Sequence, residues 1–386
     1  MAKKSSVAAT AITVSDINEA LNAISPPAMA QSWDNVGLLV GDRQARCKRL
    51  LLCIDLTPAV LDEAIAGSYE MVMAYHPPIF RPIKRLLADS SETDALVHRA
   101  IAAGIAIYSP HTALDAAPGG TNDVIAEFCD LSEVEPFEYS LAESRQSKIV
   151  TFVPSEKIDA VSFAMAAAGA GRIGAYELCS YRSQGQGTFF GTAETQPKIG
   201  QRGRLEKIDE IRLEMIAPKS RLPEVIDALL RSHPYEEPAY DIYPLTASPS
   251  FGMGRVGRLP ARTTLGGLVR RLQQKFVQQK IKGTTPISIV GKPATRIERA
   301  AVCVGAAGLL PLEHARSADC DVIVTGELRH HEALTLSRTG RTAIALGHWE
   351  SERPVLPVLA RRLTPMLPGL KIDVSKKDAS PFNGVA

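Results

Sequence analysis

The stretch Met71-Val72-Met73-Ala74-Tyr75-His76-Pro77-Pro78 predicts a short buried strand that ends at a histidine. Four apolar residues followed by a tyrosine fit a strand covered on both faces, and the residue before a proline is pushed into extended geometry. Ligands of an open α/β sheet bind beyond the carboxyl ends of its strands. His76 is therefore a candidate ligand residue, although a histidine in a surface turn would give the same local pattern.

The composition excludes several classes of protein. The 386 residues include 44 Lys and Arg against 42 Asp and Glu, with no run of like charge, which argues against a nucleic-acid or anionic-membrane partner. No apolar run approaches the length of a membrane span, and residues 1–14 are expected to form a tail rather than a secretory signal. The six cysteines are scattered without a C-x-x-C pair, which indicates reduced core residues of a cytoplasmic protein.

Strands and helices alternate along both ends of the chain. Strand 49–55, helix 58–67, strand 71–75, helix 92–103 and strand 104–109 predict a mostly parallel sheet. The alternation resumes after Gly257 with strands at 301–305, 321–325 and 342–346. Both ends therefore belong to the α/β class.

The middle of the chain follows a different pattern. Strands at 148–153, 210–216 and 239–243, a strand pair at 176–181 and 187–191, and helices at 155–168 and 222–232 predict a ferredoxin-like β-α-β-β-α-β arrangement with one extra hairpin arm. We therefore expect two α/β lobes, residues 1–132 and 249–386, that form one core. A ferredoxin-like α+β insert at residues 133–248 interrupts this core.

Histidines gather at the ends of the predicted strands. Five of the eight histidines in the chain follow predicted buried strands: His76, His111, His330, His331 and His348. Asp115, Glu327 and Glu352 lie beside them, and His348 and Glu352 are spaced i, i+4 on one helical face. Imidazole and carboxylate donors without thiolate suit Mn, Fe, Co, Ni or Zn. The alternative is a row of histidines that are hydrogen-bonded along a polar cleft.

Four further segments have simpler interpretations. We expect a turn at Trp33-Asp34-Asn35, either alone or with a ligand contact, and either a turn or an anion site at Pro118-Gly119-Gly120. The glycine-rich return at residues 251–257 suggests solvated side chains for Arg255 and Arg258, and the loop 233–238 suggests a rigid turn.

Several motifs, taken together and in order, carry a family resemblance. They are Trp33-Asp34-Asn35-Val36-Gly37-Leu38, His76-Pro77-Pro78-Ile79-Phe80, His111-Thr112-Ala113-Leu114-Asp115, Pro118-Gly119-Gly120-Thr121-Asn122-Asp123, and Gly347-His348 with Glu352. With them the chain resembles the NIF-three-like family, the GTP cyclohydrolase 1 type 2 homologues, over nearly its whole length. The stretch Glu236-Glu237-Pro238-Ala239-Tyr240-Asp241 resembles the PII-like insert of longer members.

The resemblance implies a toroidal homohexamer with a dinuclear metal centre. One ion would be held by His76, Asp115 and Glu352, and a second by His348, the bridging Glu352 and the residue before His76. That residue is Tyr75, where the family usually has a second histidine. A neutral phenol is a poor ligand, so we expect one or two divalent ions per protomer, one of them held tightly. His111 and His331 are candidate substitute or supporting ligands.

Two functions follow from this resemblance. The first is a metal-dependent hydrolase acting on a nucleotide such as GTP, or on a related small molecule. The second is a non-catalytic metal-binding, delivery or regulatory scaffold protein, with the insert as a sensor or gate; a small molecule could be its substrate or effector.

Overall fold

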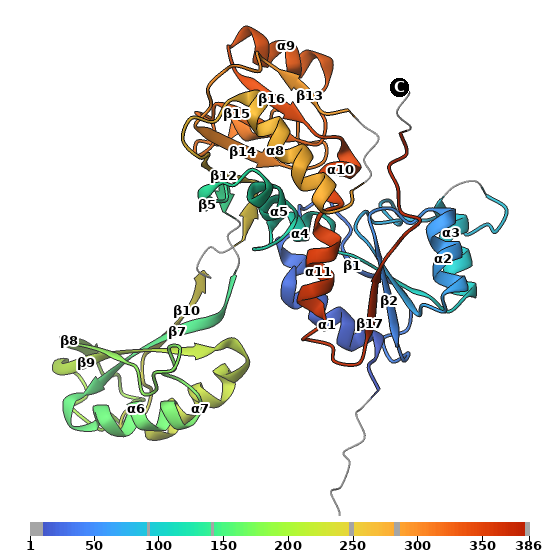
Figure 1. The fold of residues 1–386 in the computed structure, drawn as a ribbon. Helices are drawn as coiled ribbons and strands as arrows, with labels where there is room; N and C mark the ends of the chain where they lie inside the picture. Colours follow the sequence, from blue (N-terminus) through green and yellow to red (C-terminus); the bar gives the residue numbers. More distant parts are fainter. Residues whose placement is uncertain (1–10, 91–92, 140–142, 247–250, 282–285, 383–386) are drawn as a thin grey trace, which may run out of the picture. The chain divides into compact units, whose positions relative to one another are not determined.

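The computed structural model describes residues 11–90, 93–139, 143–246, 251–281 and 286–382. The chain separates into two compact units, one formed by Met1–Ser140 with Pro249–Ala386 and the other by Leu141–Ser248 (Figure 1). Most of the tail expected at residues 1–14 lies outside the described residues. Within the described part of the chain, no helix is long and apolar enough to cross a membrane.

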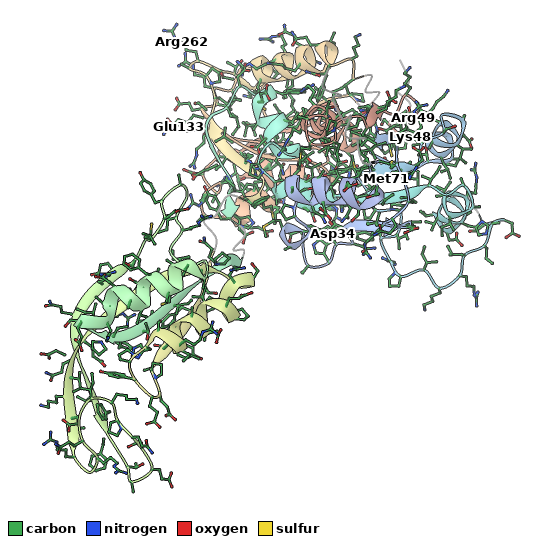
Figure 2. The ribbon with its side chains drawn as sticks, turned by 90° about the horizontal axis from the view of Figure 1, so that it is seen from below. Asp34, Lys48, Arg49, Met71, Glu133 and Arg262 are labelled. Carbon is green, nitrogen blue, oxygen red and sulfur yellow. The ribbon has the colours of Figure 1, made fainter. Side chains whose placement is uncertain are left out.

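The first sheet contains the buried strand that was predicted at residues 71–75. Its order is β1-β4-β3-β2-β17, and only β1 runs antiparallel to its neighbour. Arg49 and Met71 mark the starts of the adjacent strands β2 and β3 (Figure 2). The strands are β1 (Gly37–Val40), β2 (Arg49–Cys53), β3 (Met71–Ala74), β4 (Ala106–Ser109) and β17 (Lys371–Val374).

Alternate residues of β2 and β3 face opposite layers of helices. Leu50, Leu52, Met71 and Met73 join one apolar core with α1 (Val14–Ile24) and α11 (Val355–Leu363). Leu51, Cys53, Val72 and Ala74 join another with α2 (Pro58–Ala66) and α3 (Thr93–Ala102). A parallel strand buried on both faces reads as a continuous apolar run, which is why the pattern at residues 71–75 identified it.

The second sheet belongs to the same unit. Its order is β13-β16-β15-β14-β12-β5, with β14, β15 and β16 parallel. Helix α8 (Leu265–Gln278) contributes to the large core that this sheet shares with the first, and α9 (His330–Arg338) packs in a separate cluster. The strands are β5 (Ser132–Glu135), β12 (Arg255–Arg258), β13 (Ser288–Val290), β14 (Arg299–Cys303), β15 (Val322–Thr325) and β16 (Thr342–Ala345).

Short helices follow two of these strands: α4 (His111–Ala116) follows β4, and α10 (His348–Glu352) follows β16. The same unit contains α5 (Thr121–Phe128) and the 3₁₀ turns η1 (Pro27–Met29) and η4 (Leu310–Glu313).

The insert was expected to begin at residue 133, but β5 pairs with β12, and β6 (Glu138–Tyr139) pairs with β11 (Gly252–Met253). Residues 132–139 therefore belong to the first unit.

A buried arginine connects segments that are far apart in the sequence. The Arg255 side chain is only 3% exposed, so the expectation that it is solvated was wrong, whereas Arg258 is exposed as expected. The guanidinium of Arg255 donates to both carboxylate oxygens of Asp123 and to the carbonyls of Ala117, Gly252 and Gly254. A guanidinium can be buried only when its donors find such partners. Asp123 also accepts the N–H of Gly119, so the chain's own carboxylate closes the glycine turn.

The second unit has the ferredoxin-like β-α-β-β-α-β arrangement that was predicted for the insert. Its four strands are ordered β10-β7-β9-β8, and α6 and α7 share one apolar core with the sheet. The predicted strand pair at 176–181 and 187–191 was wrong, because Tyr181–Phe190 is a single strand that pairs with β9 through both of its glycines. The elements are β7 (Glu143–Pro154), η2 (Ser155–Lys157), α6 (Ile158–Ala167), β8 (Tyr181–Phe190), β9 (Leu205–Pro218), η3 (Lys219–Arg221), α7 (Leu222–Ser232) and β10 (Tyr240–Thr246).

Candidate metal centre

His76 directly follows the buried strand β3. The backbone N–H groups of Tyr75 and His76 donate to the carbonyls of Cys53 and Ile54, so the pairing of β3 with β2 continues up to the histidine. Pro77 cannot donate to this ladder, and the pairing therefore stops there. Asp55, at the end of β2, lies 2.9 Å from Nδ1 of His76 and fixes the orientation of its ring.

His348 and Glu352 come from the second sheet. Gly347 precedes α10 with φ +94°, a conformation that favours glycine, and it turns the chain from β16 directly into the helix. The i, i+4 spacing places both side chains on one face, with Nε2 of His348 3.2 Å from Oε1 of Glu352. Nδ1 of His348 lies 3.4 Å from Oε1 of Glu327, which follows β15.

These three side chains form the candidate metal centre. Ligand atoms of His76, His348 and Glu352 all lie within 4.8 Å of one another. Nε2 of His76 lies 3.3 Å from Oε2 of Glu352, so one carboxylate faces both imidazoles. Each imidazole thus directs Nε2 to Glu352 and Nδ1 to a second carboxylate. Metal-binding histidines commonly have this arrangement, because the outer carboxylate fixes the ring and makes the inner nitrogen more basic.

The charges in this group stabilise one another. Burial opposes ionisation of Glu352, but hydrogen bonds from His348 and His76 outweigh it and lower the pKa of the carboxyl to about 2. Burial opposes charge on the histidines too, yet hydrogen bonds to Asp55 and Glu352 raise the pKa of His76 to about 10. Glu352 likewise raises the pKa of His348 to about 9. The metal-free chain therefore carries protons where an ion would bind, and the donor set fits one divalent cation.

Tyr75 and Asp115 lie beside this group. The fully buried Tyr75 donates its hydroxyl to Oδ1 of Asp115 over 2.6 Å. Burial and the nearby Asp115 raise the pKa of the Tyr75 hydroxyl well above its ordinary range, so the phenol stays neutral. Burial also raises the pKa of Asp115 to about 6, and the charge of Glu352 adds to this effect. Asp115 therefore lies close to the predicted centre, but one of its carboxylate oxygens already accepts a hydrogen bond from Tyr75.

Of the other predicted histidines, His111 lies next to the candidate centre and His331 does not. The ring of His111 lies 5.3 Å from that of His76 and 5.5 Å from that of Tyr75, so it lies next to the group. Its Nδ1 is 2.8 Å from Oδ1 of Asp34, whose side chain is fully buried. His331 is exposed on α9 beside His330, and the structure does not bring it to the three ligand candidates.

The sequence placed Glu327 beside the histidines, and the structure shows that it orients His348. Two contributions were not predicted: Asp55 orients His76, and Asp34 orients His111. Asp55 ends a predicted strand, so the rule that selected the histidines could also have selected it. Asp34 gave no such signal, because it lies in a turn and its partner is 77 residues away in the sequence.

Glycines allow the backbone to approach the centre closely. Gly305, just after β14, has φ +66°, and an added Cβ would lie 2.6 Å from Oε1 of Glu352 and 3.5 Å from Nε2 of His348. The N–H of Gly305 donates to Oγ of Ser351 on α10 over 3.0 Å. The loop after β14 therefore closes one side of the centre with backbone alone.

The fold and the site define a class of protein: two α/β sheets whose strand ends share a His-His-Glu group, interrupted by a ferredoxin-like insert. The chain belongs to the Duf34/NIF3 (NGG1p interacting factor 3) family, whose profile matches residues 12–381. A Bacillus subtilis relative named GTP cyclohydrolase 1 type 2 homolog is 36% identical over 363 residues, which are 93% of this chain and 95% of the relative. A Mycobacterium leprae relative of the same name is 36% identical over 343 residues, 88% of this chain and 87% of its own.

Solved structures agree with this membership. A Bacillus cereus protein related to NIF3 is 31% identical with a TM-score of 0.73, covering 98% of this chain and all (100%) of its own. The Staphylococcus aureus protein SA1388 shares the fold with a TM-score of 0.77 at 22% identity, covering 98% and 100%. Both cover nearly the whole chain, so the insert is shared with these proteins. The resemblance inferred from the sequence motifs is confirmed.

Replacing Gly305 tests the close approach of the backbone. We expect Gly305→Ala to weaken divalent-ion binding at least about tenfold, because the new methyl group displaces Glu352 or His348. Elemental analysis after dialysis and thermal unfolding would measure this. Gly340→Ala is the matched control, since Gly340 has φ +71° but no atom within 4 Å of its added Cβ. Equal metal content in the two variants would contradict the proposed crowding.

Ion binding should release protons from the centre. The raised pKa values of His76 and His348 mean that their charge stabilises the metal-free fold below about pH 6.5, and this stabilisation is lost as pH rises through about 9 and 10. At pH 7.5 we therefore expect binding of Zn²⁺ to release about two protons. Calorimetric titration in two buffers of different ionisation enthalpy gives this number. His348→Ala should release about one, and equal release from both proteins would refute the account.

Proposed function

We propose that this chain binds a divalent ion through His76, His348 and Glu352 and acts as a metal-dependent hydrolase on a nucleotide or related small molecule. The observation that carries the proposal is the geometry of the three ligand atoms, which lie within 4.8 Å of one another and are each supported by further carboxylates or imidazoles. The substrate class is supported by the relatives named GTP cyclohydrolase 1 type 2 homolog.

A divalent ion at this place supplies Lewis acidity toward water and toward the attacked group. The chain's own residues hold the geometry: Glu352 faces both imidazoles, while Asp55 and Glu327 keep the rings from rotating. A cavity of about 410 Å³ borders His348 and Glu327 and is lined elsewhere by Ile289, Val290, Leu328 and Ala345. Its size suits part of a small molecule.

The second candidate function is metal storage or delivery, or a regulatory scaffold, without catalysis. The hydrogen bond from Tyr75 to Asp115 favours it, because it occupies a carboxylate that a two-ion reaction would use as a ligand. Both candidates include the homohexamer that the family resemblance implies and the cytoplasmic location that the scattered cysteines indicate. We retain both features as parts of the proposal.

Turnover by the metal-loaded protein distinguishes the two functions. On a panel of GTP, other nucleotides and phosphoesters, we expect product formation that requires the ion and falls at least about 100-fold in Glu352→Ala, because that variant removes the shared ligand. Product is measured by chromatography, and bound metal is measured in the same samples.

The control for this experiment is His331→Ala, which removes an exposed histidine outside the group. It should retain both metal and turnover. A wild-type protein that holds its ion yet forms no product from any member of the panel would overturn the hydrolase and favour the storage, delivery or scaffold function.

A further inference from the structure

Two large aromatic side chains are exposed next to the metal centre. Trp33 is 59% exposed and Phe80 is 47% exposed, and their ring centroids lie 6.0 Å apart at 64°. In such an edge-on contact, the indole does not lie flat against its neighbour. A planar ligand can therefore still stack on the indole. Leaving this much aromatic surface in water is unfavourable unless a ligand or partner covers it.

Ring contacts lead without interruption from this pair to the centre. The ring centroids of Trp33 and His111 lie 6.1 Å apart, those of His111 and His76 lie 5.3 Å apart, and those of His76 and His348 lie 5.3 Å apart. With the contact between Phe80 and Trp33, these contacts form one row of five rings. A flat ligand on Trp33 would therefore lie beside a row of rings that ends at two of the proposed metal ligands.

The aromatic pair is held in place before any ligand arrives. Asp34, next to Trp33, is fixed by His111 and by the N–H of Thr112 at 3.1 Å. Asn35 donates its side-chain amide to the carbonyl of Ile79, the neighbour of Phe80. Both aromatic residues are therefore tied to the frame on which the centre is built. A preorganised surface loses less entropy on binding than a flexible one.

We propose that Trp33 and Phe80 form a stacking platform for the planar heteroaromatic ring of a ligand, such as the base of a nucleotide. This inference rests on the proposed function, which places the reacting part of that ligand at His76, His348 and Glu352. The platform would bind the ligand through its flat ring. Any base can stack on an aromatic side chain, whereas a molecule that has only a sugar and a phosphate cannot. The ligand class is thereby narrowed from small molecules in general to those with a heteroaromatic ring.

The test uses tryptophan fluorescence of the full chain with guanosine as the probe. Of the two tryptophans, Trp33 is exposed and Trp349 is 6% exposed, with its Nε1 donating to Asp378, so quenching by a stacked ring reports on Trp33. We expect saturable quenching by guanosine and none by ribose 5-phosphate. Phe80→Ala should weaken the apparent affinity about tenfold. Phe163→Ala, which removes a 56% exposed phenylalanine of the insert, should leave it unchanged.

Three results would overturn the platform. The first is the absence of saturable quenching by guanosine, or equal quenching by ribose 5-phosphate. The second is weaker binding in Leu328→Ala but not in Phe80→Ala, which would place the ring in the apolar cavity instead. The third is a smaller assembly mass in Trp33→Leu without any quenching in the wild type, which would make the aromatic pair a contact between copies of the chain.

Metal content separates this inference from the proposed function. Trp33→Leu and Phe80→Ala should keep their bound ion, so weaker guanosine binding in them cannot be due to metal loss. If the nucleotide panel gives no product while guanosine still quenches Trp33 in a Phe80-dependent manner, the hydrolase fails and the platform stands. If turnover is observed but quenching is absent, the platform fails and the hydrolase stands.

Discussion

The structure depends on one buried carboxylate that two imidazoles from different sheets share. Glu352 is 2% exposed, and an isolated charge at such a position would be strongly destabilising. His76 arrives from the first sheet and His348 from the helix that carries Glu352, with Nε2 atoms 3.3 and 3.2 Å from its two oxygens. Protons on these rings or a divalent ion between them can balance the charge. The position of the two sheets within their common unit is thereby linked to the occupancy of one small site.

Other features of the same unit hold His76, His348 and Glu352 in position. Strand pairing continues through His76, Gly347 turns β16 into α10, and Gly305 lets a bare backbone lie against the carboxylate. Arg255 and Asp123 join β12 to α5 through a buried ion pair, and Asn122 of the same helix bonds both the carbonyl of Asp115 and the N–H of Val304. Rigid supports of this kind keep donor atoms within a few tenths of an ångström of the geometry that an ion requires. The neutral phenol of Tyr75, bonded to Asp115, fits a single ion better than two.

Much of this could be predicted from the sequence, and the reasons for the rest are physical. Buried parallel strands are continuous apolar runs, so β3 and the histidine at its end were visible, as was the i, i+4 pair His348 and Glu352. The single strand Tyr181–Phe190 was misread as part of a hairpin pair because its glycines look like a turn until β9 is seen to pair with them. Arg255 looked solvated because its partner Asp123 is 132 residues away in the sequence, and Asp34 was missed for the same reason. Local patterns identify elements and ligand types, but they do not identify which distant carboxylate faces which cation.

The number of ions held per chain tests the central claim most directly. If Tyr75 and Asp115 leave a one-ion centre at His76, His348 and Glu352, elemental analysis of the metal-reconstituted wild-type protein should give close to one ion per chain. Tyr75→His, which replaces a neutral phenol with an imidazole, should raise that value toward two. Equal stoichiometry in the two proteins would contradict the role given to Tyr75, and a wild type that retains no ion would contradict the centre itself.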